Sequence, residues 1–329
     1  MSRAAHGLGR YARAPRHLPP KAWWRILKRF GLSFLDDHLS LVAAGVAYWS
    51  LLALFPALAL FVSIYGLIAD AGQAAEQARS LAGFLPQDAA QFLYDEMVRV
   101  ADTADTSLGL SAVISFSLAL WGSNRSMKAV FEALNVAYRE RETRNIVEVN
   151  LLGLAFTFGF ILFGVLTVVL VVIVPPLLEG YRLGRGIEAT VSLLRWPILF
   201  VGMASGTALL YTFGPSRRAP RFAWVSWGAV LAGALWLAAS GLISWYAASF
   251  ADFNKTYGSL GAVVVLQTWI WLTALVVIAG AKLNAEAEHQ TRVDTTRGAP
   301  RPMGERGARV ADTLPADERS PPVMGAERG

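Results

Sequence analysis

The chain has 329 residues, of which 54% are hydrophobic and only 16% are charged, and its formal net charge is +6. Soluble domains carry about 25% charged residues, and folding cannot hide this much apolar surface in a soluble globule of this length. The composition therefore argues against a soluble protein, and the absence of cysteine excludes disulfides, thiolate metal sites and cysteine nucleophiles.

The N-terminal segment 1–20 is basic, lacks the apolar region of a cleavable signal peptide, and is expected to be a disordered tail. The stretch that follows, PPKAWWRILKRFGLSFL, predicts an amphipathic helix with apolar residues on one face and lysines and arginines on the other. Such a helix lies along an anionic membrane surface, although an ordinary helix packed on the domain is the alternative interpretation.

Six apolar segments predict membrane-spanning helices, each of which needs about 20 residues to cross a hydrocarbon core of about 30 Å. The predicted spans are residues 39–69, 106–122, 149–178, 196–213, 222–250 and 259–281. Pro56 lies inside the first span and should kink it, because proline removes a backbone hydrogen bond. The second span is the weakest, being short and rich in serine. The sequence therefore predicts an all-α polytopic membrane protein with a six-helix domain over 21–289.

Two further segments lie outside these spans. Residues 73–102 predict short amphipathic helices, broken at Pro86, on the extracytoplasmic side. Residues 290–329 contain five prolines and no aromatic residue. Such a segment buries too little apolar surface to offset the entropy of ordering, so we expect a disordered cytoplasmic tail.

The distribution of lysine and arginine predicts the topology, because these residues are retained on the cytoplasmic side. They number eight up to Ser40, five in 123–147, three in 214–221 and eight from Lys282 onward. The intervening loops 70–105, 179–195 and 251–258 carry two, three and one. Six spans with both termini in the cytoplasm of a bacterial inner membrane fit this alternation, whereas five or seven would leave one basic end outside.

No catalytic residue, cofactor site or metal site is expected. All four histidines lie outside the apolar segments, and no phosphate-binding loop, serine-hydrolase elbow, zinc-protease motif or dinucleotide fingerprint is present. We therefore expect that the protein is not an enzyme.

The stretch WGSNRSMKAVFEALNVAYRE, residues 121–140, continues the second span into polar sequence. Arg125, Lys128, Glu132 and Asn135 follow at spacings of three and four and share one helical face. Ionisable groups at membrane depth are costly and mark substrate paths, which is the functional interpretation. The alternative is a cytoplasmic helical extension in which Glu132 forms solvated pairs with the two cations.

The sixth span ends in GAKLNAEAEH. Lys282 can extend toward the lipid headgroups, and a helix leaving the membrane explains the polar residues that follow it. The alternative is a polar cytoplasmic gate that these residues form with Arg125 or Lys128. The residues that would line a substrate path are therefore Asn124, Arg125, Lys128, Glu132, Asn135, Asn284 and Glu286.

Four stretches together resemble the YihY/virulence factor BrkB family of bacterial inner-membrane proteins, once called ribonuclease BN. They are DDHLSLVAAGVAYWSLLALFPALALFVSIYGLIAD, LWGSNRSMKAVFEALNVAYRERETRN, YTFGPSRRAPRFAWVSWGAVLAGALW and FNKTYGSLGAVVVLQTWIWLTALVVIAGAKLNAEAE, within residues 20–290. The resemblance implies about six transmembrane helices and no settled activity, the ribonuclease label being regarded as a misassignment. Lys282 stands where the family typically has an acid, which argues against a cation or proton site at that position; Asn284 and Glu286 match.

Three functions are considered. The first is a transporter-like or lipid-handling protein of the cell envelope, whose apolar and aromatic lining favours an amphipathic substrate. The second is a non-transporting scaffold that binds envelope partners. The third is a tRNA-processing ribonuclease, but positive-inside topology already accounts for the basic charge that would attract RNA. The expected partners are membrane lipids, with a homo-oligomer or envelope proteins as further candidates, and no specific nucleic acid.

Overall fold

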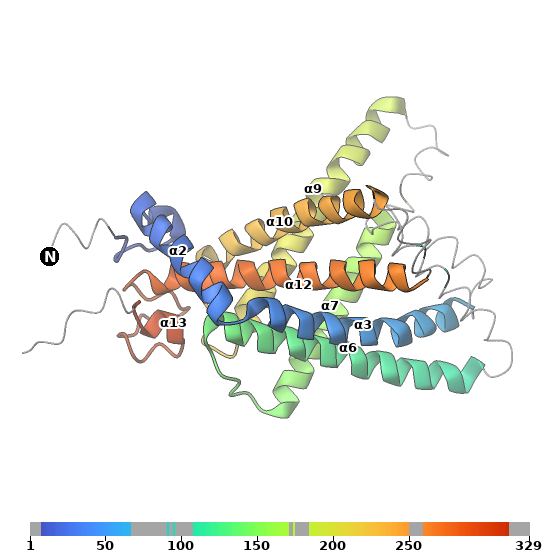
Figure 1. The fold of residues 1–329 in the computed structure, drawn as a ribbon, viewed down its shortest axis with the longest axis horizontal. Coiled ribbons are helices and arrows are strands. Elements are labelled where there is room, and N and C mark those ends of the chain that lie inside the picture. Colours follow the sequence, from blue (N-terminus) through green and yellow to red (C-terminus); the bar gives the residue numbers. More distant parts are fainter. Residues whose placement is uncertain are drawn as a thin grey trace, which may run out of the picture.

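The structure, a computed structural model, describes residues 8–66, 91, 95, 108–170, 174, 184–249 and 259–315. The named elements in these residues are all helical: η1 Pro15–His17, α2 Pro20–Asp36, α3 Leu39–Gly66, α6 Leu108–Tyr138, α7 Ile146–Val168, α9 Gly184–Phe213, α10 Phe222–Ser249, α12 Ser259–His289 and α13 Arg309–Asp312 (Figure 1). The expected all-α fold is confirmed for this part of the chain. The predicted helices of 73–102 lie outside the described residues, apart from Gln91 and Asp95.

Each predicted span overlaps one of the six longest named helices. By length and apolar composition, four of the described helices are candidates for crossing a membrane. The qualifying segments are Leu39–Pro56 of α3, Ile146–Phe163 of α7, Phe222–Ile243 of α10 and Val263–His289 of α12. α9 contributes the shorter apolar segment Pro197–Phe213, and α6 does not qualify. Pro56 lies within α3, which continues to Gly66, and the kink there stays a prediction.

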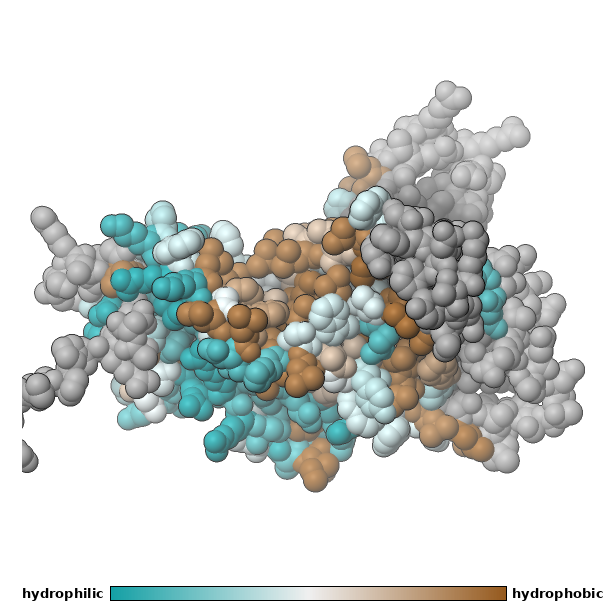
Figure 2. All heavy atoms as spheres, viewed as in Figure 1, coloured by the Kyte–Doolittle hydropathy of each residue, from teal (hydrophilic) through white to brown (hydrophobic). Residues whose placement is uncertain are grey.

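Four helices, α10, α12, α3 and α6, run alongside one another, and α7 and α9 run obliquely behind them (Figure 1). The six long helices alternate in direction, so α2 and α13 lie at the same end of the bundle. We call this end, with the connections 139–145 and 214–221 and the segment 290–315, the α2 end. Hydrophilic residues gather there, whereas hydrophobic residues cover the middle of the bundle (Figure 2).

The two terminal segments were predicted wrongly where they are described. Residues 8–20 pack through Ala12 and Leu18 against Trp224. Residues 290–315 are ordered by polar contacts, which composition does not reveal. The Asp294 carboxylate accepts hydrogen bonds from the backbone N–H groups of Thr296 and Arg301, at 2.9 Å each, and these bonds lower its pKa although burial opposes them. Residues 1–7 and 316–329 lie outside the described residues.

The buried Arg306 also orders the C-terminal segment. Its guanidinium donates to the carbonyls of Ala311 at 2.7 Å and Arg292 at 2.8 Å. The Asp312 carboxylate accepts from the backbone N–H of Gly304 and Gly307. Side chain-to-backbone hydrogen bonds of this kind order the segment together with Val310, which packs into the main hydrophobic core.

α10 and α12 cross at two glycines. A Cβ atom at Gly280 would lie 2.6 Å from the Gly228 carbonyl oxygen and 2.5 Å from the Tyr211 hydroxyl. A Cβ atom at Gly228 would overlap the Gly280 carbonyl and the Asn284 amide. Small residues allow this backbone approach, which packs the two helices where little hydrophobic driving force exists between them.

We predict that Gly228→Ala destabilises the protein, because the added methyl group would overlap the Gly280 carbonyl, which is backbone, and the Asn284 amide that bonds the start of α10. The expected cost is about 1–3 kcal/mol, typical of overpacking. Gly241→Ala, on the same helix α10 and with no atom within 4 Å of its Cβ position, is the matched control and should be neutral or stabilising. Thermal unfolding in detergent measures both; equal melting temperatures for the two variants would contradict the close crossing.

Candidate functional site

The C-terminal end of α12 does not leave the bundle. Every residue from Ala281 to Thr291 is buried, including Lys282, Glu286 and Glu288. The expectation that Lys282 extends toward lipid headgroups is wrong, because its side chain is fully buried and its Nζ lies 2.6 Å from an Asp37 carboxylate oxygen. The polar residues after the sixth span are therefore part of the interior of the α2 end.

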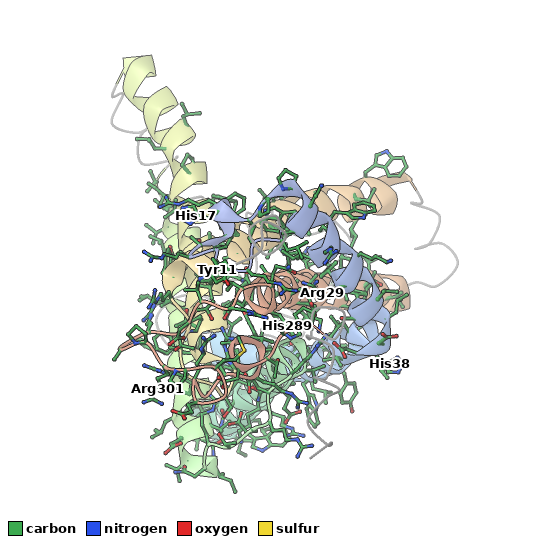
Figure 3. All side chains as sticks on the ribbon, turned by 90° about the vertical axis from the view of Figure 1, so that its left-hand side faces the viewer. Tyr11, His17, Arg29, His38, His289 and Arg301 are labelled. Carbon is green, nitrogen blue, oxygen red and sulfur yellow. The ribbon has the colours of Figure 1, made fainter. Side chains whose placement is uncertain are left out.

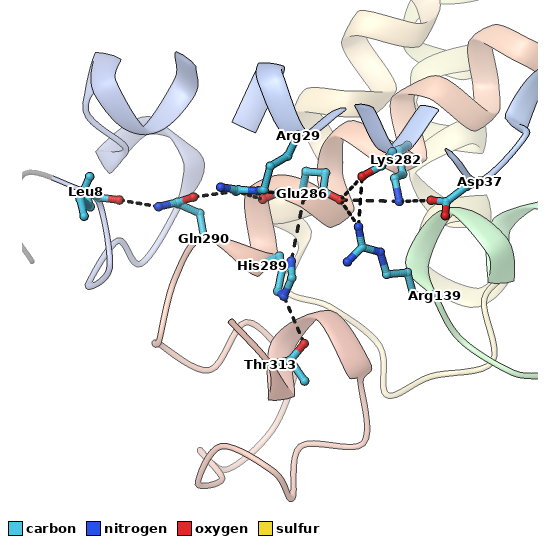
Figure 4. Close-up of polar contacts among 10 residues, drawn as sticks. Leu8, Arg29, Asp37, Arg139, Lys282, Glu286, His289, Gln290 and Thr313 are labelled. Atoms are coloured by element: carbon cyan, nitrogen blue, oxygen red, sulfur yellow. Dashed lines mark hydrogen bonds and ion pairs between the residues drawn. The ribbon is translucent and has the colours of Figure 1, made fainter. Parts of the chain in front are cut away.

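Glu286 is the centre of a buried ion cluster (Figure 4). Its carboxylate accepts from Arg29 of α2 at 3.1 Å and from Arg139, after α6, at 2.9 Å. Lys282 Nζ lies 3.6 Å away, and the Ser33 hydroxyl donates at 3.4 Å. Glu286 is only 2% exposed, so these contacts replace the water that the carboxylate gives up.

Arg139 reaches Glu286 because of its backbone conformation. It follows the last residue of α6 with a φ of 59°, a left-handed conformation that glycine adopts more easily. His38, which follows α2, has a φ of 50°. The ion pair explains why arginine and not glycine occupies this left-handed position, since glycine there would leave Glu286 without one of its cations.

A second buried pair lies nearby at the α2 end, which Figure 3 views end-on. Arg217 Nη2 lies 2.7 Å from a Glu288 carboxylate oxygen, and both side chains are fully buried. The guanidinium also stacks 4.2 Å from the Tyr138 ring centroid, and Thr295 donates to Glu288 at 2.9 Å. Burial lowers the pKa of Arg217, but the neighbouring Glu288 outweighs this and the net pKa is raised, so Arg217 keeps its charge.

The two other asparagine candidates at this end have structural partners. Asn284 accepts from the Gly228 N–H at 2.9 Å and donates to the Val225 carbonyl at 3.1 Å, which ties α12 to the start of α10. Asn135 accepts from the Ser216 N–H at 2.7 Å and donates to Glu142 at 3.0 Å. Hydrogen bonds from Arg144 lower the pKa of that carboxyl to about 2. Neither asparagine is free to bind a substrate.

Asn124 lies between α6 and α7. Its Nδ2 donates to Asn150 Oδ1 at 2.8 Å, and its buried Oδ1 has no partner among the described residues. The oxygen sits where a side chain at Gly153 would stand. A polar pair between two apolar helices holds them together.

Arg125 differs from the other candidates. Its guanidinium carbon lies 4.6 Å from the Trp49 ring centroid, and Trp49 meets Trp121 edge to face at a centroid distance of 6.4 Å. No carboxylate within the described part of the chain forms an ion pair with Arg125 or Lys128. The expected solvated pairs with Glu132 are therefore not formed there.

The structure thus separates the predicted path into two groups. Asn135, Asn284 and Glu286 belong to the buried α2 end, whereas Asn124, Arg125, Lys128 and Glu132 lie earlier along α6. Sequence reasoning missed the partners Arg29, Asp37, Arg139 and Arg217. These partners are 71 to 257 residues from their acid or base, with no local spacing to reveal them.

The long apolar helices, the polar α2 end and the apolar middle define a helical membrane protein. The family model described as Virulence factor BrkB matches residues 32–304, so the chain belongs to this family. The resemblance seen in the sequence is thereby confirmed.

Relatives have about one quarter of their residues in common with this chain. The "Putative ribonuclease-like protein YfkH" of Bacillus subtilis is 27% identical over 258 residues, 74% of this chain and 88% of that protein. The "UPF0761 membrane protein IL2447" of Idiomarina loihiensis is 26% identical over 80% of this chain and 90% of its own length. A "UPF0761 membrane protein" of Alkalilimnicola ehrlichii is 28% identical over 80% of this chain and 59% of its length. No solved structure matches the chain.

We predict that Glu286→Ala strongly destabilises the protein, because it leaves Arg29, Arg139 and Lys282 together without their shared carboxylate. Removing one partner of a buried ion pair costs about 3–5 kcal/mol. Glu305→Ala, an exposed carboxylate of the C-terminal segment, is the control and should change stability by less than about 0.5 kcal/mol. Unfolding followed by tryptophan fluorescence in detergent measures both, and similar midpoints would contradict the central position of Glu286.

Proposed function

We propose that the protein is a six-span protein of the bacterial inner membrane that handles lipids in the cell envelope, with both termini in the cytoplasm. In this proposal α6 and α9 cross the membrane with the four helices that qualify by composition. The basic residues near the α2 end support a cytoplasmic location for that end. The names of the two UPF0761 relatives support a location in a membrane, but none of the three names mentions a lipid.

Arg125 carries the lipid-handling proposal. The depth of Arg125 follows from its neighbour Ser126, whose hydroxyl lies 2.8 Å from that of Ser50 on α3. Ser50 is roughly 16 Å from Leu39, the first residue of α3, at about 1.5 Å per residue. This depth is close to the middle of a hydrocarbon core of about 30 Å. A charge there is costly and marks a functional site, and no carboxylate of the described residues pairs with Arg125.

The aromatic neighbours of Arg125 favour an amphipathic ligand. Trp121 is 63% exposed and Tyr48 is 55% exposed, so the guanidinium borders an open, apolar surface. An anionic headgroup would bind Arg125 through charge-assisted hydrogen bonds while its acyl chains stay against the apolar residues. A small ion would not need this surface.

A membrane scaffold is the second candidate. It is favoured by the ordered segment 290–315, which packs on the connection 214–221. The N–H of Arg218 donates to Gly307 and the N–H of Arg221 donates to Thr295. In the proposed topology this surface would be a cytoplasmic platform for partners. A ribonuclease is the third, suggested by the name of YfkH; RNA cleavage by the purified protein, lost on adding EDTA, would favour it.

The topology is tested by reporter fusions. Fusions of alkaline phosphatase and green fluorescent protein to either end should give fluorescence and no phosphatase activity, since both ends face the cytoplasm. Fusions within 70–105 should give the reverse. Phosphatase activity at either terminus would overturn the six-span arrangement.

The lipid proposal is tested with Arg125→Ala. Native mass spectrometry of the purified protein should show bound anionic phospholipid, and the variant should retain about tenfold less, since a hydrogen bond to a charged group is worth about 1.5–3 kcal/mol. Arg218→Ala removes an arginine at the α2 end and should retain the wild-type amount. Equal lipid retention by the two variants, with unchanged melting temperatures, would remove Arg125 as the site.

A further inference from the structure

One face of α6 carries a row of polar and aromatic side chains through the apolar part of the bundle. The row consists of Ser117, Trp121, Arg125, Lys128 and Glu132. Their spacings of four, four, three and four place them within an arc of about 80°, at about 3.6 residues per turn. We call this row the α6 stripe.

The α6 stripe faces outward. Ser117, Trp121 and Glu132 are exposed, Arg125 and Lys128 are partly buried, and the apolar residues beside them, Ile114 and Leu118, are about half exposed. Ionisable residues in membrane helices almost always face the bundle interior. The face of α6 toward α3 instead carries small residues, with Gly122 against Ala53 and Ser126 bonded to Ser50.

The length of the stripe matches a path across much of the membrane. From Ser117 to Glu132 it extends about 22 Å, at about 1.5 Å per residue, against a hydrocarbon core of about 30 Å. Glu132 lies toward the α2 end, where α6 ends at Tyr138, and Arg125 lies near the middle of the membrane. The stripe therefore links the proposed cytoplasmic surface with the membrane interior.

A second copy of the chain is a poor occupant for this surface. Membrane proteins insert in one orientation, so the two-fold axis of a homodimer lies along the membrane normal and each residue lies at the same depth as its copy. A dimer with the stripe on this axis would bring like side chains together. Arg125 would face Arg125 and Lys128 would face Lys128, which is repulsive at low dielectric. The two cations of the stripe outnumber its one carboxylate, so the charge fits an anionic occupant.

We propose that the α6 stripe is a track along which the headgroup of an anionic phospholipid moves between the membrane leaflets. This inference rests on the proposed function and adds an activity to it. The phosphate exchanges between Lys128 and Arg125, each a donor to phosphate oxygens, while the acyl chains remain in the bilayer. Trp121 continues the path beyond Arg125 with an indole that offers both a flat apolar face and an N–H donor.

Movement along the track lowers the cost of carrying a charge through hydrocarbon. Without the protein, the phosphate would lose its hydration with nothing in return. On the stripe, two cations spaced three residues apart replace part of that hydration in succession. No nucleotide or ion is required, so the protein should equilibrate lipid between the leaflets in both directions.

The test uses the full-length protein reconstituted into vesicles that contain a fluorescent phosphatidylglycerol. Dithionite bleaches the outer-leaflet label, and the slow phase then reports movement from the inner leaflet. The wild type should bleach beyond the outer half within minutes, whereas protein-free vesicles stop near half. Arg125→Gln should slow this phase by about tenfold, the change expected when one charge-assisted hydrogen bond is lost. Arg125→Lys should keep most of the rate, and Arg218→Gln should match the wild type.

The outcomes separate this inference from the proposed function. Wild-type protein that retains anionic lipid but moves it no faster than protein-free vesicles would overturn the track and leave lipid binding intact. Equal rates for Arg125→Gln and Arg218→Gln would also overturn it. The chain has no cysteine, so Trp121→Cys gives a clean test of a second copy. Efficient disulfide formation between two copies, without lipid movement, would assign the stripe to an interface and overturn the proposal.

Discussion

The structure of the α2 end depends on one buried carboxylate. Glu286 binds Arg29 of α2 and Arg139 after α6, and it lies beside Lys282 on its own helix. Two elements distant in sequence, α2 and the end of α6, are thereby fixed against α12. Burying a carboxylate is costly unless cations and donors replace its water, so the cluster holds together only as a whole. The Arg217–Glu288 pair attaches the connection 214–221 to the same helix, and the packed C-terminal segment covers it.

This arrangement divides the polar residues of the membrane domain into two kinds. Those on α12 are saturated by protein partners: Asn284 bonds the start of α10, and Glu286 bonds its cations. On α6, Asn135 is likewise held by Ser216 and Glu142. Arg125 differs, since it contacts an aromatic ring, pairs with no carboxylate of the described residues and borders an open surface. A group with a full set of partners stabilises a structure, whereas a charged group without a counter-ion at membrane depth is available to a ligand. The proposals for lipid binding and lipid movement follow from that difference.

The cluster also accounts for a departure from the family pattern. Lys282 stands where the resemblance predicts an acid. In this chain the lysine lies between two acids, at 2.6 Å from Asp37 and 3.6 Å from Glu286, so its charge is neutralised without water. Asp37 precedes His38, whose left-handed backbone turns the chain from α2 into α3. Through this ion pair, Lys282 of α12 holds the connection between the amphipathic helix α2 and the first span, α3.

The sequence by itself determined the helices and the family. A long apolar segment inside a membrane must form its backbone hydrogen bonds within itself as a helix, so each predicted span overlaps a long helix. The four quoted stretches identified the family. The sequence also placed Arg125 among the candidates for a substrate path, because a charge close to the end of an apolar run is visible without a fold. Only the tertiary structure decided the partners of Glu286 and the order of 290–315. Ion pairs between residues more than 100 positions apart, and hydrogen bonds from side chains to distant backbone, leave no periodic pattern in a sequence. The helical spacing of the α6 stripe could be predicted, but its outward direction could not, because that depends on which face of α6 packs against α3.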